Sequence, residues 1–471
     1  MKAIHFFGII LTCIYSISCG GNTHGQNENI DSSLIFKNTH SDTFQTGKII
    51  NPVICQSDAS QSYALYLPAN SNKKEALPVI YFFDAHGDGA LPLQKYFKLA
   101  DKYHFILAGS NNSKNGNDFN DAENIWKSMS DDVQTRVSIN TNRIYTCGFS
   151  GGAKVATYIA LHDPEVKGVI ANSAGLPDIL NAGNFNFSFT AIAGEGDMNM
   201  TDLVSINNSL DNTQTYHRII FFDGIHEWAP ESTMNIAFEG LQLDAMRQKL
   251  IPVNDTFINI FIAESKKSIT DLIQSNQLLK AEEVCRLSIS MLDGVSNDTG
   301  WFKDKETSLA NNPAFQKQSQ LNQNLLAKEE SIKAGYQQQF QNGDINYWSK
   351  TINDVKLKAN AKTPEGAMYQ RLQAYLSLAF YSISNQLINR DQNKDAQYFV
   401  TLYKMDDPTN SEAWYFSAIL DARNHDSKAT NDDLLKAVEL GFNDKKRLEQ
   451  QPEFQTTEVP VNFADIESKM K

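Results

Sequence analysis

Residues 143–153 read RIYTCGFSGGA, and this stretch decides the fold expected for the first half of the chain. An apolar run ends at Cys147, the pattern Gly-x-Ser-x-Gly is centred on Ser150, and a helix-forming segment follows. This order is typical of a strand, a tight turn and a helix, in which the turn lifts the serine hydroxyl above the sheet edge. Small residues at Gly148 and Gly152 let the strand and the helix approach each other. The stretch therefore predicts an exposed nucleophile at Ser150.

Short apolar runs recur on both sides of this turn and alternate with longer polar or amphipathic segments. Runs bounded by Gly, Pro, Asn and Asp indicate buried strands of a mostly parallel sheet. The predicted strands are 63–67, 79–83, 105–108, 143–147, 168–171, 189–193 and 218–222. Helices are expected near 93–103, 123–138 and 151–163. Residues 46–248 are therefore predicted to form one α/β domain.

From residue 249 to the C-terminus the pattern changes. Strand-like runs stop, and Ala, Leu, Gln, Lys and Glu recur at helical spacing. Pro408 and Phe442 are 34 residues apart, and Trp414 falls on the early aromatic position when Ala437 takes the late small position of the same register. Residues 249–471 thus resemble tetratricopeptide repeats, and a helical bundle without true repeats is the alternative. Both interpretations predict an all-α domain.

The N-terminus has the composition of an export signal. Lys2 precedes an apolar run that is shorter than the roughly 20 residues a membrane-spanning helix needs. The run ends in SISCG at 16–20, which resembles the bacterial lipobox. The resemblance implies that residues 1–18 are removed, that Cys19 is lipidated, and that the polar segment 19–45 is a flexible tether. We then expect a bacterial cell-envelope protein held to the membrane by its lipid only, the alternative being an ordinary signal peptide.

Charge and cysteine usage exclude several classes of protein. The 471 residues carry 42 Lys+Arg against 55 Asp+Glu, a net charge of −13 without a basic block, so no nucleic-acid partner is expected. Besides Cys13 and Cys19 of the export signal, the chain has Cys55, Cys147 and Cys285, an odd number at wide spacing that implies no disulfide framework. Buried thiols are expected, the alternative being one bridge in an oxidising compartment. No Cys/His cluster has zinc spacing, so no metal site is expected. No other cofactor is expected either.

The segments after two later strands contain the partners that a nucleophilic serine needs. An imidazole must take the hydroxyl proton, and a carboxylate must orient that imidazole. The run 189–193 is followed by Gly-Glu-Gly-Asp197, and the run 218–222 is followed by Asp-Gly-Ile-His226. The order Ser…Asp…His is the one this topology uses, and both residues follow carboxyl ends of predicted strands, where open α/β sheets bind ligands.

Other residues in the same segments compete for these roles. The rivals are His217 as the base and Glu195, Asp202 or Asp223 as the acid. Asp223 can instead begin the turn that presents the histidine. Trp228 is expected to pack in the core, the alternative being a place in the substrate cleft.

The reaction also requires an oxyanion hole, for which two backbone N–H groups are needed. Gly151, directly after the serine, is expected to supply one of them. The other is expected from the loop after 79–83, which contains His86 and several glycines that allow the backbone to turn. His86 itself is expected to shape this loop rather than act as a second base.

Five ordered motifs together resemble α/β-hydrolase esterases, grouped with polyhydroxybutyrate depolymerases, feruloyl esterases and acetyl-xylan esterases. They are YALYLP at 63–68, the His86-Gly87 loop, residues 142–152, the Gly194…Asp197 turn and His226-Glu227-Trp228. The resemblance spans about residues 60–235 and implies that Ser150 is the nucleophile, His226 the base, Asp197 the orienting acid, and Gly151 with the His86 region the oxyanion hole. Two positions depart from the pattern: Ile225 stands where a second glycine is usual before the histidine, and Glu195 lies two residues from the proposed acid.

The expected activity is hydrolysis of a carboxylic ester through an acyl-enzyme, with acyl or feruloyl groups on polysaccharide as the substrate class by family analogy. One alternative is a scaffold or binding lipoprotein whose hydrolase half is degenerate. Another is a serine peptidase or transacylase with the same catalytic residues. The helical half is too long to be a lid alone, so a second function, binding, is expected to accompany the hydrolysis. The sequence leaves open whether this half gates the cleft, binds polymer or recruits a protein partner.

Overall fold

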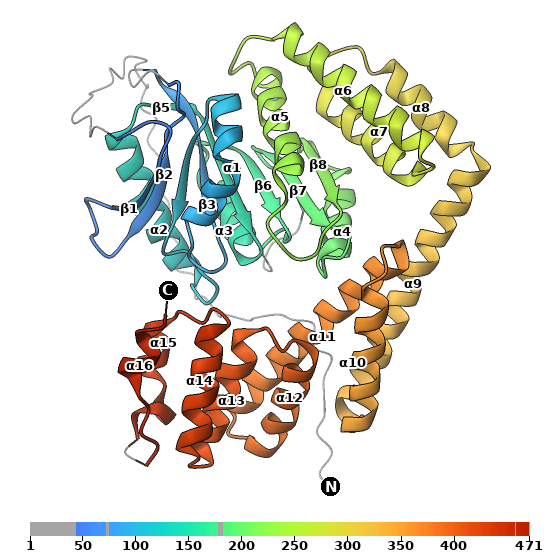
Figure 1. Cartoon of the computed structure of the whole chain (residues 1–471). Helices are drawn as coiled ribbons and strands as arrows, with labels where there is room; N and C mark the ends of the chain where they lie inside the picture. Colours follow the sequence, from blue (N-terminus) through green and yellow to red (C-terminus); the bar gives the residue numbers. More distant parts are fainter. Residues whose placement is uncertain (1–43, 72–74, 178–181, 457, 471) are drawn as a thin grey trace, which may run out of the picture. The chain divides into compact units, whose positions relative to one another are not determined.

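The computed structural model describes residues 44–71, 75–177, 182–456 and 458–470 (Figure 1). Cys19, the predicted signal peptide and nearly all of the predicted tether lie outside these residues. The chain forms two compact units. The first unit takes in the described residues up to Ala193 together with Asn199–Phe222 and Glu227–Leu309, and the second takes in Gly194–Met198, Asp223–His226 and the residues from Ala310 onward.

The first unit is built on a mixed sheet. Among the described residues it has eight strands in the order β1-β2-β4-β3-β5-β6-β7-β8. The strands are β1 (Ile49–Ile54), β2 (Ser62–Tyr66), β3 (Leu77–Phe83), β4 (Ile106–Ser110), β5 (Ile139–Phe149), β6 (Val166–Asn172), β7 (Ser188–Gly194) and β8 (His217–Phe222). The pairs β1–β2 and β2–β4 are antiparallel, whereas the pairs from β4 through β7 are parallel. The mostly parallel α/β class is confirmed.

Burial explains which strands the sequence pattern detects. Every residue of β3, β4 and β7 is buried, because helices cover both faces of a parallel sheet, and such strands therefore appear as continuous apolar runs. The strand that was missed, β1, lies at the edge of the sheet and is partly exposed. Asn51 and Pro52 interrupt its apolar run, and proline within a sheet is tolerated mainly at an edge.

Helices cover both faces of the sheet (Figure 1). They are α1 (Ala90–Tyr103), α2 (Phe119–Arg136), α3 (Gly151–His162), α4 (Met200–Leu210) and α5 (Glu231–Arg247). One core joins the sheet to α2, α3 and α4 through residues such as Ile125, Ile159 and Leu203. The opposite core joins it to α1 and α5 through Leu93 and Phe238. The three predicted helices are present, and α4 and α5 complete the two layers.

Three further helices belong to the first unit: α6 (Asp255–Gln274), α7 (Leu278–Leu292) and α8 (Gly300–Ala310). A buried charge network fastens α7 to the sheet layer. Asp244 of α5 accepts hydrogen bonds from Arg218 and Arg247, and Arg247 also donates to the carbonyl oxygens of Ser290 and Met291. The elements thus become helical after about residue 249, as expected, while the compact unit extends to Leu309.

The second unit is helical. Its main helices are α9 (Pro313–Asn342), α10 (Ile345–Ala359), α11 (Pro364–Asn389), α12 (Asn393–Asp406), α13 (Ser411–Arg423) and α14 (Ser427–Glu439), followed by α15 (Lys445–Gln450), the short 3₁₀ helix η1 (Pro452–Gln455) and α16 (Phe463–Glu467). One core around Trp348, Phe380 and Tyr415 joins them. The all-α class is confirmed, and the tetratricopeptide assignment stays a prediction. In the described part of the chain, no helix combines the length and the apolar character that crossing a membrane requires.

Candidate active site

Ser150 occupies the strained turn that its sequence predicts. It lies between β5 and α3 with φ 53° and ψ −122°, a conformation that costs a residue other than glycine of order 1–3 kcal/mol. The flanking glycines make the turn possible. A Cβ atom on Gly148 would lie 2.0 Å from the carbonyl oxygen of Gly152, and one on Gly152 would lie 2.0 Å from that of Phe83. Strained backbone of this kind is typical of a serine nucleophile.

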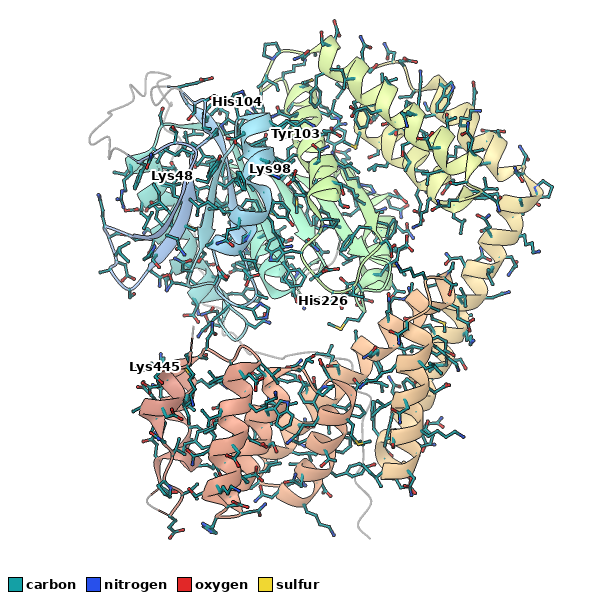
Figure 2. All side chains as sticks on the ribbon, in the orientation of Figure 1. Lys48, Lys98, Tyr103, His104, His226 and Lys445 are labelled. Atoms are coloured by element: carbon teal, nitrogen blue, oxygen red, sulfur yellow. The ribbon has the colours of Figure 1, made fainter. Side chains whose placement is uncertain are left out.

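The second unit contains a buried carboxylate–imidazole pair. His226 Nδ1 lies 3.0 Å from Asp197 Oδ1, and the Asp197 side chain is fully buried. Figure 2 shows His226 in the segment between β8 and α5. Gly196 donates its N–H to the carbonyl oxygen of Gly224 at 2.9 Å, which joins the two loops. Because a carboxylate only accepts, the proton lies on Nδ1, and Nε2 is the nitrogen that can take a proton from a nucleophile.

Asn172 anchors the chain on both sides of the site, and the sequence analysis missed it. Its carbonyl oxygen accepts the N–H of Ser150 at 2.9 Å. Its side chain donates to the carbonyl oxygen of Glu227 at 3.2 Å and accepts the N–H of Ala229 at 2.8 Å. Asn172 is fully buried at the end of β6, where the only sequence signal is a polar residue closing an apolar run. It therefore fixes both the serine turn and the segment directly after His226.

Asp84 organises the loop after β3. This buried carboxylate accepts the indole N–H of Trp228 at 2.8 Å and the backbone N–H of His86 at 2.8 Å, and His86 Nδ1 lies 3.3 Å away. The backbone N–H of His86, in the loop expected to complete the oxyanion hole, is thus engaged by Asp84. The imidazole of His86 is largely exposed. Trp228 is buried against Phe82 and other aromatic rings, so it packs in the core as predicted.

The electrostatics of this loop follow from burial and hydrogen bonding. Burial alone would raise the pKa of Asp84, but the hydrogen bonds from His86 and Trp228 outweigh it and hold the pKa below its ordinary value. The hydrogen bond to Asp84 raises the pKa of His86, against the opposing effect of desolvation. The pair therefore favours an ionised Asp84 and a protonated His86.

Asn115 is a second residue that the sequence analysis missed. A Cβ atom on Gly151 would lie 2.0 Å from Asn115 Oδ1, so this amide lies directly against the residue expected to donate to the oxyanion. The backbone N–H of Asn115 donates to the carbonyl oxygen of Ala85 at 2.8 Å, which ties it to the loop after β3. The surrounding sequence is an ordinary polar loop, which offers no functional signal.

The structure separates the rival candidates. His217 begins β8, whereas His226 follows the end of that strand. Both ring nitrogens of His217 have partners, the carbonyl oxygen of Thr215 at 2.8 Å and the carboxylate of Asp211 at 3.1 Å. Among the candidate acids, Asp197 is hydrogen-bonded to His226, with Oδ1 3.0 Å from Nδ1. The other acids that the sequence left open for the orienting role are Glu195, Asp202 and Asp223.

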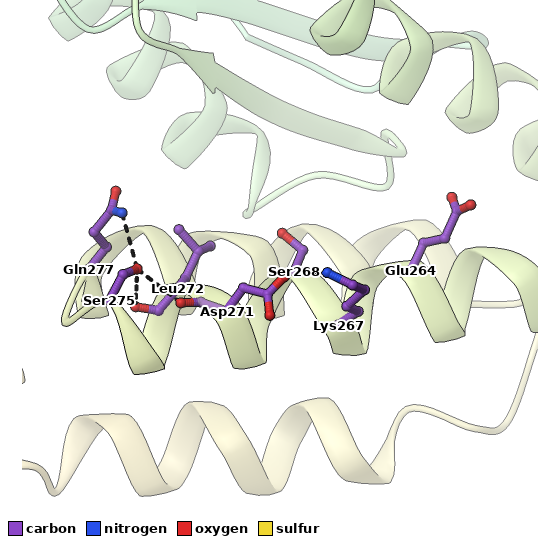
Figure 3. A pocket seen from close by; sticks show the side chains of 7 residues that line it. All are labelled: Glu264, Lys267, Ser268, Asp271, Leu272, Ser275 and Gln277. Carbon is purple, nitrogen blue, oxygen red and sulfur yellow. Dashed lines mark hydrogen bonds and ion pairs between the residues drawn. The ribbon is translucent and has the colours of Figure 1, made fainter.

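A hollow of about 420 Å³ lies along α6 (Figure 3). It is lined by Glu264, Lys267, Ser268, Asp271, Leu272, Ser275 and Gln277. Its ion pair between Lys267 and Asp271, at 2.6 Å, is an ordinary surface pair of one helix face. Within the described ranges, no cluster of three His, Cys, Asp or Glu residues could hold a metal ion.

The three cysteines in the described residues are buried free thiols, as expected. Burial raises the pKa of the Cys147 thiol well above its ordinary value. It also raises the pKa of Cys55 to about 11, helped by the charge of Asp132. Thiols of this kind are poor nucleophiles, so Ser150 has no cysteine rival.

Comparisons with known proteins give structural similarities only. No protein-family model matches this sequence, and no curated protein matches it. A hyperthermophilic esterase from Pyrobaculum calidifontis is 12% identical, with a TM-score of 0.34, and the match covers 43% of this chain and 85% of the esterase. The feruloyl esterase module from Clostridium thermocellum, complexed with sinapinate, is also 12% identical, with a TM-score of 0.31 and coverages of 41% and 85%.

The acylaminoacyl peptidase of Pyrococcus horikoshii is again 12% identical, with a TM-score of 0.31, and the match covers 40% of this chain and 39% of the peptidase. At such identities and TM-scores these likenesses carry no argument about this chain. The fold class is carried by the sheet itself: a mostly parallel eight-stranded sheet in the described residues, helices on both faces, and a strained serine turn after β5. The first unit has the α/β-hydrolase fold.

Proposed function

We propose that this protein is a serine hydrolase that cleaves carboxylic esters through an acyl-enzyme. Ser150 is the nucleophile, His226 the general base, Asp197 the orienting acid, and the N–H of Gly151 one oxyanion donor. The observation that carries the proposal is the bond between the buried Asp197 carboxylate and Nδ1 of the partly exposed His226, because it orients an imidazole for proton transfer. The positive φ of Ser150 supports it, since strain of this kind concentrates at functional residues.

The reaction follows from these roles. Ser150 Oγ attacks the ester carbonyl carbon while His226 Nε2 takes the hydroxyl proton, and Asp197 stabilises the imidazolium. The negative charge that develops on the carbonyl oxygen is stabilised by backbone N–H groups that include Gly151. When the intermediate collapses, the carbon–oxygen bond to the alcohol breaks and His226 protonates the leaving alkoxide. Water, deprotonated by His226, then attacks the acyl-enzyme. The bond from the acyl carbon to Ser150 Oγ breaks, His226 returns the proton to Oγ, and the carboxylic acid leaves.

For the substrate we propose acyl or feruloyl esters on polysaccharide. This step rests on the resemblance of the sequence motifs to esterases and is an argument by family analogy. Lipidation at Cys19 would hold the enzyme at a bacterial cell envelope, where such polymers are within reach. The proposal includes no metal or other cofactor, and a protein partner for the helical region is part of it.

The test uses the purified chain and a nitrophenyl ester of a short acyl group. We expect a burst of nitrophenol from the wild type, covalent labelling by a fluorophosphonate probe, and loss of both in Ser150→Ala. Ser209→Ala is the matched control, because Ser209 lies on α4 and donates only to the carbonyl oxygen of Ser205. Undiminished turnover or labelling in Ser150→Ala would exclude the assignment.

The two alternatives give different results in the same assay. A peptidase or transacylase with the same residues would be labelled at Ser150, but it would turn over an amide, or transfer the acyl group to an added alcohol or amine, faster than it hydrolyses the ester. A binding lipoprotein with a degenerate hydrolase half would be neither labelled nor active. The pairing of Asp197 with His226 favours the enzyme, because a decayed site has no reason to retain it.

A further inference from the structure

The loop that carries Asp197 is held by an arginine of the helical second unit. Arg371 lies on α11, and its NH1 group donates to the carbonyl oxygen of Glu195 at 2.5 Å. Both groups belong to the second unit, in which Gly194–Met198 packs with the helices. The carbonyl oxygen that Arg371 contacts is two residues before the proposed acid. The contact therefore restrains the segment that determines the position of the Asp197 carboxylate.

A buried carboxylate on another helix of the same unit also holds the Arg371 guanidinium. Its Nε and NH2 groups donate to Glu329 Oε2 at 2.8 and 2.6 Å. Glu329 lies on α9 and is fully buried, and its other oxygen lies 3.0 Å from Lys333 Nζ. Charge-assisted bonds of this geometry fix both direction and distance, since the guanidinium is a rigid planar fork. The arginine is thus preorganised to meet the loop.

The neighbouring side chain on α11 shows how closely the loop approaches the helix. A Cβ atom on Gly196 would lie 2.2 Å from Gln370 Oε1 and 3.0 Å from Gln370 Cβ. Gly196 does not belong to the glycines with positive φ, so close approach, and not a special backbone conformation, is what requires a glycine here. Gln370 in turn donates to the carbonyl oxygen of Ala359 at 3.2 Å, which restricts its side chain.

We propose that Arg371 is a positioning residue for the hydrolysis, and that a function of the helical region is to hold the acid loop of the catalytic site. Three contacts follow one another along this loop. Arg371 binds the carbonyl oxygen of Glu195, and Gly196 packs against Gln370 of α11. The N–H of Asp197 then donates to the carbonyl oxygen of Gly194 at 3.0 Å. Because this backbone is fixed, the hydrogen bond between Asp197 Oδ1 and His226 Nδ1 is maintained. The inference rests on the proposed function, and it assigns the helices a role within this chain.

The test compares arginine variants of the full chain. In Arg371→Ala we expect kcat for the nitrophenyl ester to fall about 100-fold, the scale of a displacement of about 1 Å in a catalytic group, with KM changed less than about 3-fold. Arg371→Lys should recover part of this loss, because its ammonium can still donate one bond to Glu195. The matched control is Arg423→Ala. Arg423 donates to the Glu453 carboxylate at 2.8 Å and to the Ile388 carbonyl at 3.0 Å, the same chemistry at a different place in the helical unit.

Hydrogen exchange of residues 194–198 tests the same inference without any turnover. The N–H groups of Gly196 and Asp197 are hydrogen-bonded, so they should exchange faster in Arg371→Ala than in the wild type, and at the wild-type rate in Arg423→Ala. Equal losses of kcat in the two alanine variants, or unchanged exchange in Arg371→Ala, would overturn the inference. If the wild type fails to hydrolyse esters, the proposed function is wrong, while faster exchange confined to Arg371→Ala would still support the loop-holding role.

Discussion

Replacing Asn172 with alanine should damage both stability and activity, because its side chain is hydrogen-bonded to one buried and one partly buried backbone group. The variant removes the donor to the Glu227 carbonyl oxygen and the acceptor of the Ala229 N–H. A buried backbone group that loses its partner costs about 1–3 kcal/mol and a partly buried one costs less, so we expect the free energy of unfolding to fall by about 3 kcal/mol. That loss is smaller than the roughly 5–15 kcal/mol of typical domains, so the variant should still fold.

Activity should fall further than stability alone explains. Glu227 and Ala229 directly follow His226, and without their anchor the segment moves relative to the serine turn, which Asn172 still holds through its backbone. A displacement of about 1 Å costs about 100-fold in rate, so kcat/KM should fall by about that factor. Urea unfolding measures the loss of stability, and nitrophenyl ester kinetics without denaturant, under conditions where both proteins are folded, measure the loss of activity.

The control for this prediction is Asn184→Ala. Asn184 also accepts a backbone N–H, that of Gln214 at 2.9 Å, but it does so at the surface. Its loss should change the free energy of unfolding by less than about 0.5 kcal/mol and leave kcat/KM unaltered. Wild-type turnover in Asn172→Ala would refute the reasoning, because it would mean that the anchor does not determine where His226 lies.

Two further predictions concern pH. Asp406 is buried, both of its carboxylate oxygens lack a hydrogen-bond partner, and burial raises its pKa to about 7. The folded protein therefore binds the Asp406 proton more tightly than the unfolded chain does. The free energy of unfolding accordingly falls as the pH rises from about 4 to about 7. Asp406→Asn should therefore raise the free energy of unfolding at about pH 8 by up to roughly 4 kcal/mol and change it little at about pH 4, and a destabilised variant at pH 8 would contradict this. For His86, whose pKa is raised by Asp84, the stabilisation is full below its ordinary pKa and is lost as the pH rises through the raised value. Thermal unfolding of His86→Ala should accordingly show a deficit at about pH 5 that disappears at about pH 9, and a deficit equal at both pH values would argue against the pair.

The sequence pattern predicts those elements whose conformation depends on neighbouring residues along the chain. A strand buried on both faces is a continuous apolar run, and the turn at Ser150 needs small residues at Gly148 and Gly152, so the strands near the site and its nucleophile were predictable from the sequence. The edge strand β1 was not, because exposure and Pro52 remove its apolar signal. The transition to an all-α region after about residue 249 was predictable for the same reason as the strands, since periodicity is a property of neighbouring residues.

Partnerships between distant residues were decided only by the tertiary structure. The sequence determined that a histidine and several carboxylates follow the later strands, but four acids remained open until the fold brought Asp197 to His226. Neither the anchor Asn172 nor the contact of Arg371 with Glu195, 176 positions away along the chain, produces any periodicity or motif. The physical reason is that a hydrogen bond depends on where two backbones lie in space, and that position is set by the packing of whole elements rather than by adjacent side chains.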